Sequence, residues 1–157
     1  MVLSNVQQRW KVSYYMQENS GVFIVAREWI VKAENDLKTS SYLLKMSKDC
    51  PLDAVCFHAQ QCVEKYLKAF LVIEGIDFPK THDIERLVSM LPDSIWLKLG
   101  IEEQRRLTDY ATVTRYPGEY EPIGITETKK SVTLARRVRK EIRNLLPKEV
   151  LSRKKQK

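Results

Sequence analysis

Two stretches of the sequence hold a histidine whose neighbours carry groups that could bind a ligand. In the first, His58, Gln61 and Lys65 are three and four residues apart, a spacing that places them on one side of a helix. That side borders the apolar stripe of the same helix, so the three side chains could line a cleft. Alternatively, His58 caps a backbone group at the edge of the core. Both interpretations stay open at this point.

The second histidine, His82, lies at the start of a short predicted helix, next to Asp83 and two residues after Lys80. Backbone N–H groups at a helix N-terminus attract anions, so a phosphate could bind there. Equally, Asp83 in the first turn would stabilise its own helix through the helix dipole, without any ligand.

A loop rich in Pro and Gly carries three further candidates, Arg115, Tyr116 and Tyr120. The guanidinium group of Arg115 suits a phosphate, and the two tyrosines could stack on a base. In the alternative interpretation, Arg115 pairs with a carboxylate such as Asp36 or Glu119, and the tyrosines only pack as lids.

Positive charge is concentrated at the C-terminal end of the chain. Residues 129–157 hold 12 Lys and Arg against 2 acidic residues, whereas residues 1–128 hold 15 against 18. Four of these cations share one face of the last predicted helix: Lys129, Arg136, Lys140 and Arg143. Such a stripe could hold a nucleic-acid backbone with steep salt dependence, although a solvated helix face would also be polar.

The spacing of apolar residues predicts helices almost throughout, and no run alternates like a β-strand. Helices are expected over residues 26–48, 51–74, 84–91, 95–112 (with an interruption near Gly100) and 127–146. Thr81 and Thr126 are the expected N-caps of the third and last helices. Together, these segments predict an all-α fold, an antiparallel four- to five-helix up-and-down bundle. The expected division is an N-terminal extension (1–25), the bundle (26–146) and a fraying basic tail (147–157).

Two apolar stripes define the expected core. The stripe of the first helix is Ile30, Ala33, Leu37, Ser41 and Leu44. The stripe of the second helix is Val55, Ala59, Cys62, Tyr66, Phe70 and Ile73, with a further apolar set at Phe57, Leu67 and Leu71. A helix that is apolar on two sides is expected at the centre of the bundle, or buried against a partner as well.

The composition excludes several classes of protein. The chain has 157 residues, 5 Gly and 6 Pro, which indicates one globular domain rather than a disordered or collagen-like chain. Cys50, Cys56 and Cys62 are expected to be reduced core residues, since their spacing suits neither a metal site nor a disulfide framework. With no signal peptide and no apolar run near the roughly 20 residues of a membrane span, we expect a cytoplasmic protein.

Four segments together resemble one family. They are Ala33-Glu34-Asn35-Asp36-Leu37, the run from Phe57-His58-Ala59-Gln60-Gln61 to Ala69, Thr81-His82-Asp83-Ile84, and Thr114-Arg115-Tyr116-Pro117. Over residues 26–146 the chain resembles the HEPN domain. The resemblance implies a helical bundle, a homodimer with its cleft near the subunit interface, and association with a minimal nucleotidyltransferase. It also implies nucleotide binding as a proposed activity of this subgroup.

Other HEPN branches are metal-independent endoribonucleases with an Arg that is separated from a His by four to six residues. No Arg occupies the matching windows before His58 or His82, so catalysis would require Arg115 to meet one of these histidines. We therefore favour a non-catalytic module that binds a nucleotide, a nucleotidyltransferase partner or both, as part of a toxin–antitoxin or defence pair. The alternatives are a divergent endoribonuclease acting on RNA and a purely structural helical partner.

The expected ligand-binding residues are Asp36, His58, Gln61, Lys65, His82, Asp83, Arg115, Tyr116 and Tyr120. His58, His82 and Arg115 are also the candidates for catalysis. We expect no metal, no cofactor other than a nucleotide ligand, and no membrane contact.

Overall fold

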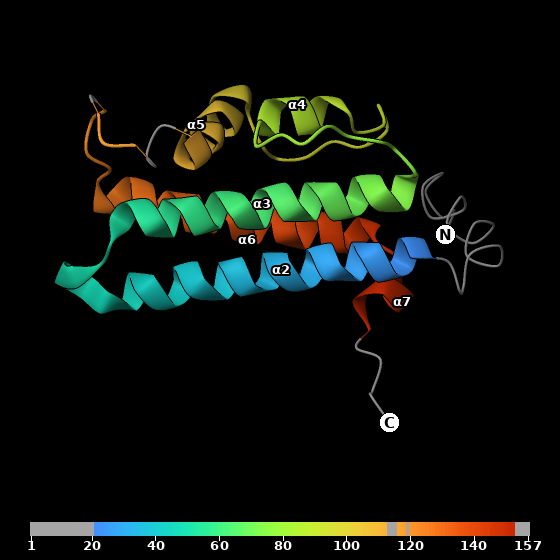
Figure 1. Cartoon of the computed structure of the whole chain (residues 1–157), viewed down its shortest axis with the longest axis horizontal. Helices are drawn as coiled ribbons and strands as arrows, with labels where there is room; N and C mark the ends of the chain where they lie inside the picture. Colours follow the sequence, from blue (N-terminus) through green and yellow to red (C-terminus); the bar gives the residue numbers. More distant parts are fainter. Residues whose placement is uncertain (1–20, 113–115, 119, 153–157) are drawn as a thin grey trace.

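The computed structural model describes residues 21–112, 116–118 and 120–152, and within these ranges it is all-helical (Figure 1). Its elements are α2 (Gly21–Leu43), η1 (Leu44–Asp49), α3 (Leu52–Glu74), α4 (Ile84–Ser89), α5 (Ile101–Thr112), α6 (Ile125–Leu145) and α7 (Lys148–Leu151). The predicted all-α bundle is confirmed. Most of the expected N-terminal extension (residues 1–20) and Arg115 lie outside the described residues.

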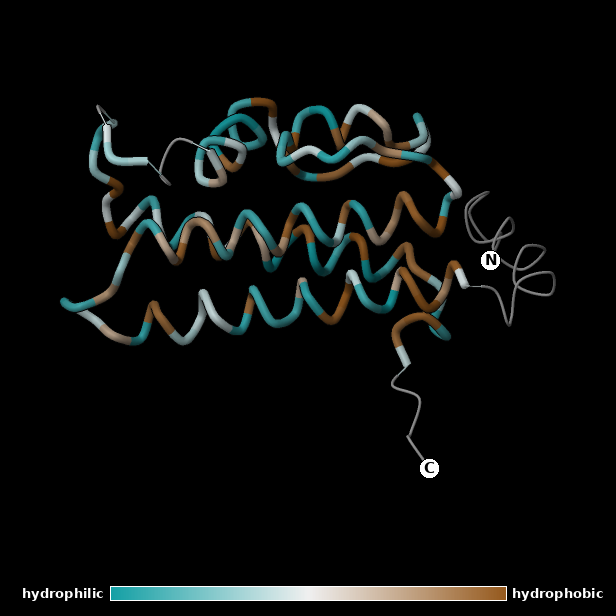
Figure 2. The backbone as a smooth tube through the Cα atoms, viewed as in Figure 1, coloured by the Kyte–Doolittle hydropathy of each residue, from teal (hydrophilic) through white to brown (hydrophobic). Residues whose placement is uncertain are grey.

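Helix α3 is the centre of the fold, because it packs against α2, α4, α5 and α6. All six residues of its predicted stripe are buried, and so are Leu67 and Leu71 on its other side. Each large apolar side chain buried in this way contributes about 1.5–3 kcal/mol. The helix ends at Gly75, whose φ of 67° is left-handed, and its N–H bonds to the carbonyl oxygens of Leu71 and Val72. Figure 2 shows hydrophobic residues recurring between hydrophilic ones along each long helix, as amphipathic packing requires.

Helix α2 differs from its prediction at both ends and in its buried face. It begins at Gly21 instead of residue 26, because Phe23 extends the core by one turn. It ends at Leu43, and the 3-10 turn η1 then carries the chain to Cys50. The buried polar positions of α2 are Asp36 and Ser40, whereas Leu37 and Ser41 are only half-buried. From residue 36 onward, the buried positions of α2 therefore lie one residue earlier in the sequence than the predicted stripe.

Helices α4 and α5 form a layer over α3 (Figure 1). The N-cap of α4 is Asp83, whose Oδ1 accepts a hydrogen bond from the Arg86 N–H at 3.0 Å. The predicted cap, Thr81, is wrong; its hydroxyl oxygen accepts from the Asp83 N–H at 3.1 Å. Helix α5 starts only at Ile101, after the predicted interruption, while Leu97 and Leu99 before it are buried without helix.

Helix α6 runs alongside α3 in the same direction, because the α4–α5 layer returns the chain to the end where α3 began (Figure 1). Its N-cap is Gly124 rather than the predicted Thr126. The expected fraying of the tail is wrong for residues 148–151, which form α7. Val150 is buried, and the Glu149 carbonyl accepts a hydrogen bond from Arg27 at 2.7 Å. None of the described helices is long and apolar enough to cross a membrane.

Candidate functional site

His58 belongs to a three-residue cluster between α2 and α3. Its Nδ1 lies 2.8 Å from Oδ1 of Asp36, and the ammonium group of Lys65 bonds to the other oxygen of the same carboxylate. Asp36 is buried, whereas the His58 side chain is 30% exposed. Because Nδ1 faces the carboxylate, Nε2 is the ring nitrogen directed away from it, and the tautomer with its proton on Nδ1 leaves Nε2 as an acceptor. No described residue bonds to that Nε2.

A second carboxylate, Glu64 on α3, holds the other histidine. Its Oε2 lies 3.0 Å from His82 Nδ1 and accepts from the amide nitrogen of Gln60 at 2.9 Å. Its Oε1 accepts from Lys68 Nζ at 2.7 Å. The Glu64 side chain is only 3% exposed, while that of His82 is 52% exposed. The carboxylate is therefore a buried anchor that presents a histidine at the surface.

The Glu64 carboxyl is stabilised in its charged form. Burial alone would raise the pKa of Glu64, but hydrogen bonds from Lys68, Gln60 and His82 outweigh burial and lower this pKa below its usual value. Lys68 also donates to the Thr81 carbonyl oxygen at 2.9 Å. The Lys68 ammonium group lies 5.3 Å from the Trp29 ring centroid, within the range of a cation–π contact.

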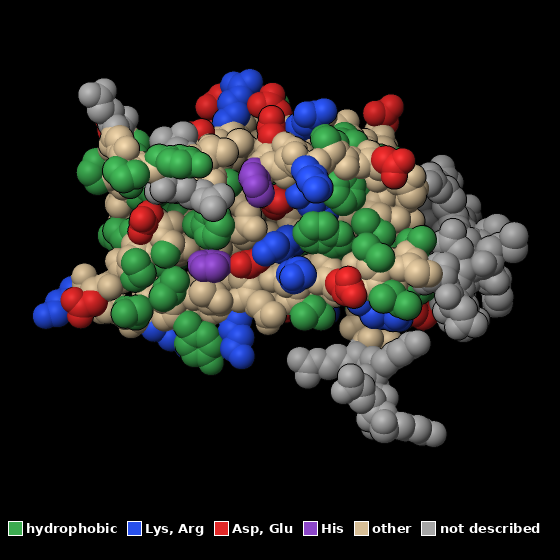
Figure 3. Space-filling model, viewed as in Figure 1, with side chains coloured by type: hydrophobic (Ala, Val, Ile, Leu, Met, Phe, Trp, Pro, Cys, Tyr) green, Lys and Arg blue, Asp and Glu red, His purple; other side chains and the backbone are tan. Residues whose placement is uncertain are grey.

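The two clusters form one continuous surface on α3. Gln61 bonds to the Glu64 cluster, because its amide nitrogen donates to Gln60 at 2.8 Å and lies 3.3 Å from the Glu64 carboxylate. Helical spacing places Gln61 on the same side of α3 as His58 and Lys65 of the first cluster. Both histidines are visible on one side of the molecule, with Lys and acidic side chains between them (Figure 3). We call this surface the α3 polar face; its members are Asp36, His58, Gln60, Gln61, Glu64, Lys65, Lys68 and His82.

The remaining predicted ligand residues are not brought to this face by any described contact. Asp83 caps α4 through its carboxylate, as in the interpretation that needs no ligand. Tyr116 is 71% exposed and Tyr120 is half-buried, and neither has a described bond to the α3 polar face. The position of Arg115, on which the pairing with a histidine depends, lies outside the described residues.

The predicted basic stripe of α6 divides into two kinds of residue. Lys129 and Lys140 are exposed, and Arg136 reaches the Ser41 hydroxyl at 3.2 Å. Arg143 instead lies 3.3 Å from the Tyr66 hydroxyl and 3.9 Å from the Glu34 carboxylate.

Glu34 is held mainly by Arg139, whose guanidinium group contacts both carboxylate oxygens at 2.5 and 3.1 Å. Burial would raise the pKa of Glu34, but the bonds from Arg139 and Tyr66 outweigh burial and lower it. The same neighbourhood raises the pKa of the buried Tyr66, mainly by burial. These side chains tie α6 to α2 and α3.

Sequence reasoning singled out both histidines but missed their most buried partner, Glu64, together with Gln60 and Lys68. A signal was present: Gln60, Glu64 and Lys68 follow one another at four-residue intervals, which places them on one row of α3 beside His58, Gln61 and Lys65. A charged row inside an otherwise apolar helix requires partners, because an unpaired buried charge is costly.

Known proteins resemble this chain in sequence and in fold. The relative named "Putative toxin MJ1304", from Methanocaldococcus jannaschii, is 47% identical over 116 residues, covering 66% of this chain and 71% of that protein. The crystal structure of TT1696 from Thermus thermophilus superposes with a TM-score of 0.65 and 25% identity, covering 77% of this chain and 98% of that one. The sequence model of the HEPN domain matches residues 26–146. The chain therefore belongs to the HEPN domain family.

Proposed function

We propose that this protein is the toxin-type member of a toxin–antitoxin pair and that it binds a nucleotide or RNA at the α3 polar face. The observation that carries the proposal is the pair of histidines, each held at Nδ1 by a buried carboxylate. The name of the Methanocaldococcus relative supports the toxin assignment. A homodimer and a minimal nucleotidyltransferase partner belong to the same proposal.

The chemistry of the face suits a nucleotide. With Nδ1 on a carboxylate, the Nε2 atom of each imidazole is left to bond a ribose hydroxyl or a base, and Lys65 offers N–H groups to a phosphate. Asp36 and Glu64 already balance the charges of Lys65 and Lys68. The face therefore relies on placed hydrogen bonds rather than on excess charge, which favours a specific small ligand over a long polyanion.

The test combines native mass spectrometry with binding. The untagged protein isolated from its host is expected to carry nucleotide mass, a nucleotidyltransferase chain or both, and to be a dimer. His58→Ala and His82→Ala should each weaken nucleotide binding about tenfold in calorimetry, whereas Asn144→Ala on exposed α6 should not. Full binding by both histidine variants would contradict the site, and a bare monomer would contradict the assembly.

A second candidate function is a metal-independent endoribonuclease, which the two-histidine arrangement favours. One imidazole would take the proton of an RNA 2′-hydroxyl, and the 2′-oxygen would attack phosphorus. The bond from phosphorus to the 5′-oxygen would break as the other imidazolium gives that oxygen a proton. The products are a 2′,3′-cyclic phosphate and a 5′-hydroxyl end. Cleavage in EDTA that His58→Ala and His82→Ala both abolish would select this function over binding alone.

A further inference from the structure

A second charged site lies at the end of the bundle where η1 joins α2 to α3. A cavity of about 600 Å³ opens there, and three lysines line it, Lys45 and Lys48 from η1 and Lys129 from α6. Apolar side chains of Leu44, Leu52 and Ile125 line the same cavity. It therefore combines an apolar surface with cationic groups, in the size range of sites for small ligands.

The lining of this cavity carries no counter-charge, and the two acidic residues next to it in the sequence, Asp49 and Asp53, are exposed. None of its lining residues is acidic, and its lysines form no ion pair with any residue in the described part of the chain. This arrangement differs from that of Arg139 and Arg143, which share the Glu34 carboxylate. Because these three exposed lysines have no ion-pair partner, an anion from outside can bind them without breaking an ion pair of the fold.

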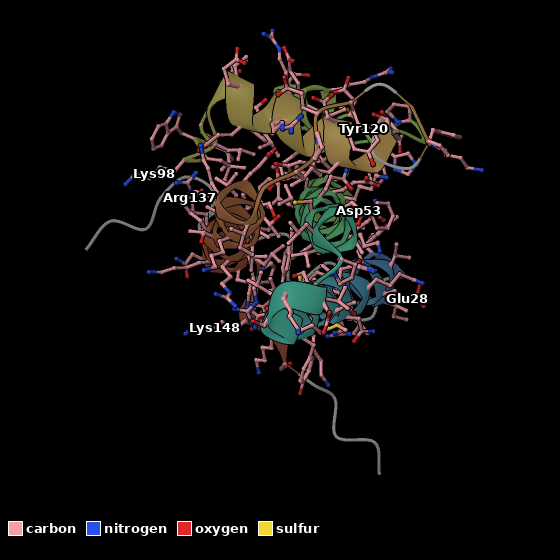
Figure 4. The ribbon with its side chains drawn as sticks, turned by 90° about the vertical axis from the view of Figure 1, so that its left-hand side faces the viewer. Glu28, Asp53, Lys98, Tyr120, Arg137 and Lys148 are labelled. Carbon is pink, nitrogen blue, oxygen red and sulfur yellow. The ribbon has the colours of Figure 1, made fainter. Side chains whose placement is uncertain are left out.

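The cationic surface continues from the cavity in two directions. Lys45 lies 4.9 Å from the ring centroid of Tyr42, which is 59% exposed and also lies 5.9 Å from the Lys38 ammonium group. In the other direction, Arg136 bridges from α6 to Ser41 on α2. Figure 4 looks at the bundle from this end, with the teal turn η1 in front and α6 beside it.

We propose that this surface, the basic end, binds a single-stranded nucleic acid through its phosphates; its members are Lys38, Tyr42, Lys45, Lys48, Lys129 and Arg136. Single-strand sites combine unpaired cations along the backbone with exposed aromatic rings on which bases stack, and Tyr42 between two lysines fits that pattern. The cavity would take one nucleotide, with its base on the apolar lining and its phosphate on the lysines.

The basic end lies close to the α3 polar face along the same helix. Leu52 at the cavity and His58 are six residues apart on α3, a rise of about 9 Å. Six residues also turn the helix so that Leu52 and His58 point about 120° apart, and a strand that joined the two sites would pass around α3. The inference rests on the proposed function only for this link, since the basic end would bind a strand even if the polar face took no ligand.

The experiment measures fluorescence anisotropy with labelled ten-nucleotide RNA and DNA of one sequence. The Lys48→Glu/Lys129→Glu variant should bind at least tenfold more weakly, and its slope of log K against log salt should be shallower by about 1.4. The control, Arg86→Glu/Lys98→Glu, changes net charge equally at exposed residues away from the cavity and should bind like the parent protein.

Each outcome decides the proposal. Equal loss for RNA and DNA supports backbone binding, and loss for RNA alone supports it with RNA as the strand. Equal binding by the lysine variant and the control would overturn it. Polyglutamate that displaces the oligonucleotide at equal charge concentration would also overturn it, in favour of an acidic protein partner. The two proposals are tested separately by His58→Ala. This variant should lose nucleotide binding at the α3 polar face but keep the salt slope of oligonucleotide binding at the basic end.

Discussion

The α3 polar face and the basic end are both charged, but their charges are partnered in opposite ways. On the polar face, Lys65 and Lys68 each have a carboxylate of their own chain, and the carboxylates also orient the two histidines. At the basic end, Lys48 and Lys129 have no such partner among the described residues. The first surface uses charge to fix geometry, whereas the second leaves charge available for an external anion.

This difference separates the expected effects of mutation. Breaking a buried ion pair leaves an uncompensated charge in the interior, which destabilises the fold by about 3–5 kcal/mol. Removing an exposed, unpaired lysine costs the fold almost nothing, within about 0.5 kcal/mol. The polar face should therefore respond to mutation first in stability, and the basic end only in binding.

The largest effect is expected for Glu64→Ala. The variant leaves Lys68, whose side chain is 7% exposed, without its counter-ion and releases His82. We expect the free energy of unfolding to fall by about 3 kcal/mol in urea titration. The control is Glu102→Ala, since the Glu102 side chain is 88% exposed. A loss below about 1 kcal/mol in Glu64→Ala would mean that the face is not a buried anchor.

Acid should act on the same group, because a lowered carboxyl pKa stabilises the fold only while the carboxyl is ionised. The pKa values of Glu64 and Glu34 are lowered from about 4.5. Their stabilisation is therefore complete above pH 4.5 and is lost as pH falls through the lowered folded-state values. Urea titrations should show a steep decline in this range. Glu64→Gln should make the decline shallower, and an unchanged slope would assign acid sensitivity elsewhere.

Two arginines on α6 bring the comparison onto one helix. Arg139 pairs with Glu34, while Arg136 reaches only a hydroxyl. Arg139→Ala should cost about 1 kcal/mol in unfolding, a value kept small because both partners are about one-third exposed. Arg136→Ala should leave stability unchanged and weaken oligonucleotide binding instead. If Arg136→Ala lowered stability and Arg139→Ala weakened oligonucleotide binding, the presence of an ion pair would not distinguish residues that stabilise the fold from residues that bind a strand.

The sequence allowed the fold to be predicted well where apolar spacing is regular, as in α3, whose six-residue stripe is entirely buried. It failed where polar groups are buried, as in α2, because nothing local reveals that Asp36 meets His58 from another helix. Similarly, Glu64 could be placed beside His58 by helical spacing, but its contact with His82 depends on how the connector after Gly75 folds back. The cavity required η1, α3 and α6 to converge, which no single segment encodes.

The smallest effect is expected from a change to the backbone turn that carries the lysines of the basic end. Ser47 lines the cavity and has a φ of 59° and a ψ of −121°, a conformation that suits glycine. Ser47→Gly should raise the free energy of unfolding by about 0.5 kcal/mol, because relief of backbone strain exceeds the entropy that glycine loses on folding. Ser47→Ala keeps the strained backbone and should show no gain. If the lysines bind a strand through charge alone, Ser47→Gly will keep the oligonucleotide affinity unchanged. A loss of affinity would instead mean that the serine hydroxyl or the rigidity of the turn contributes to binding.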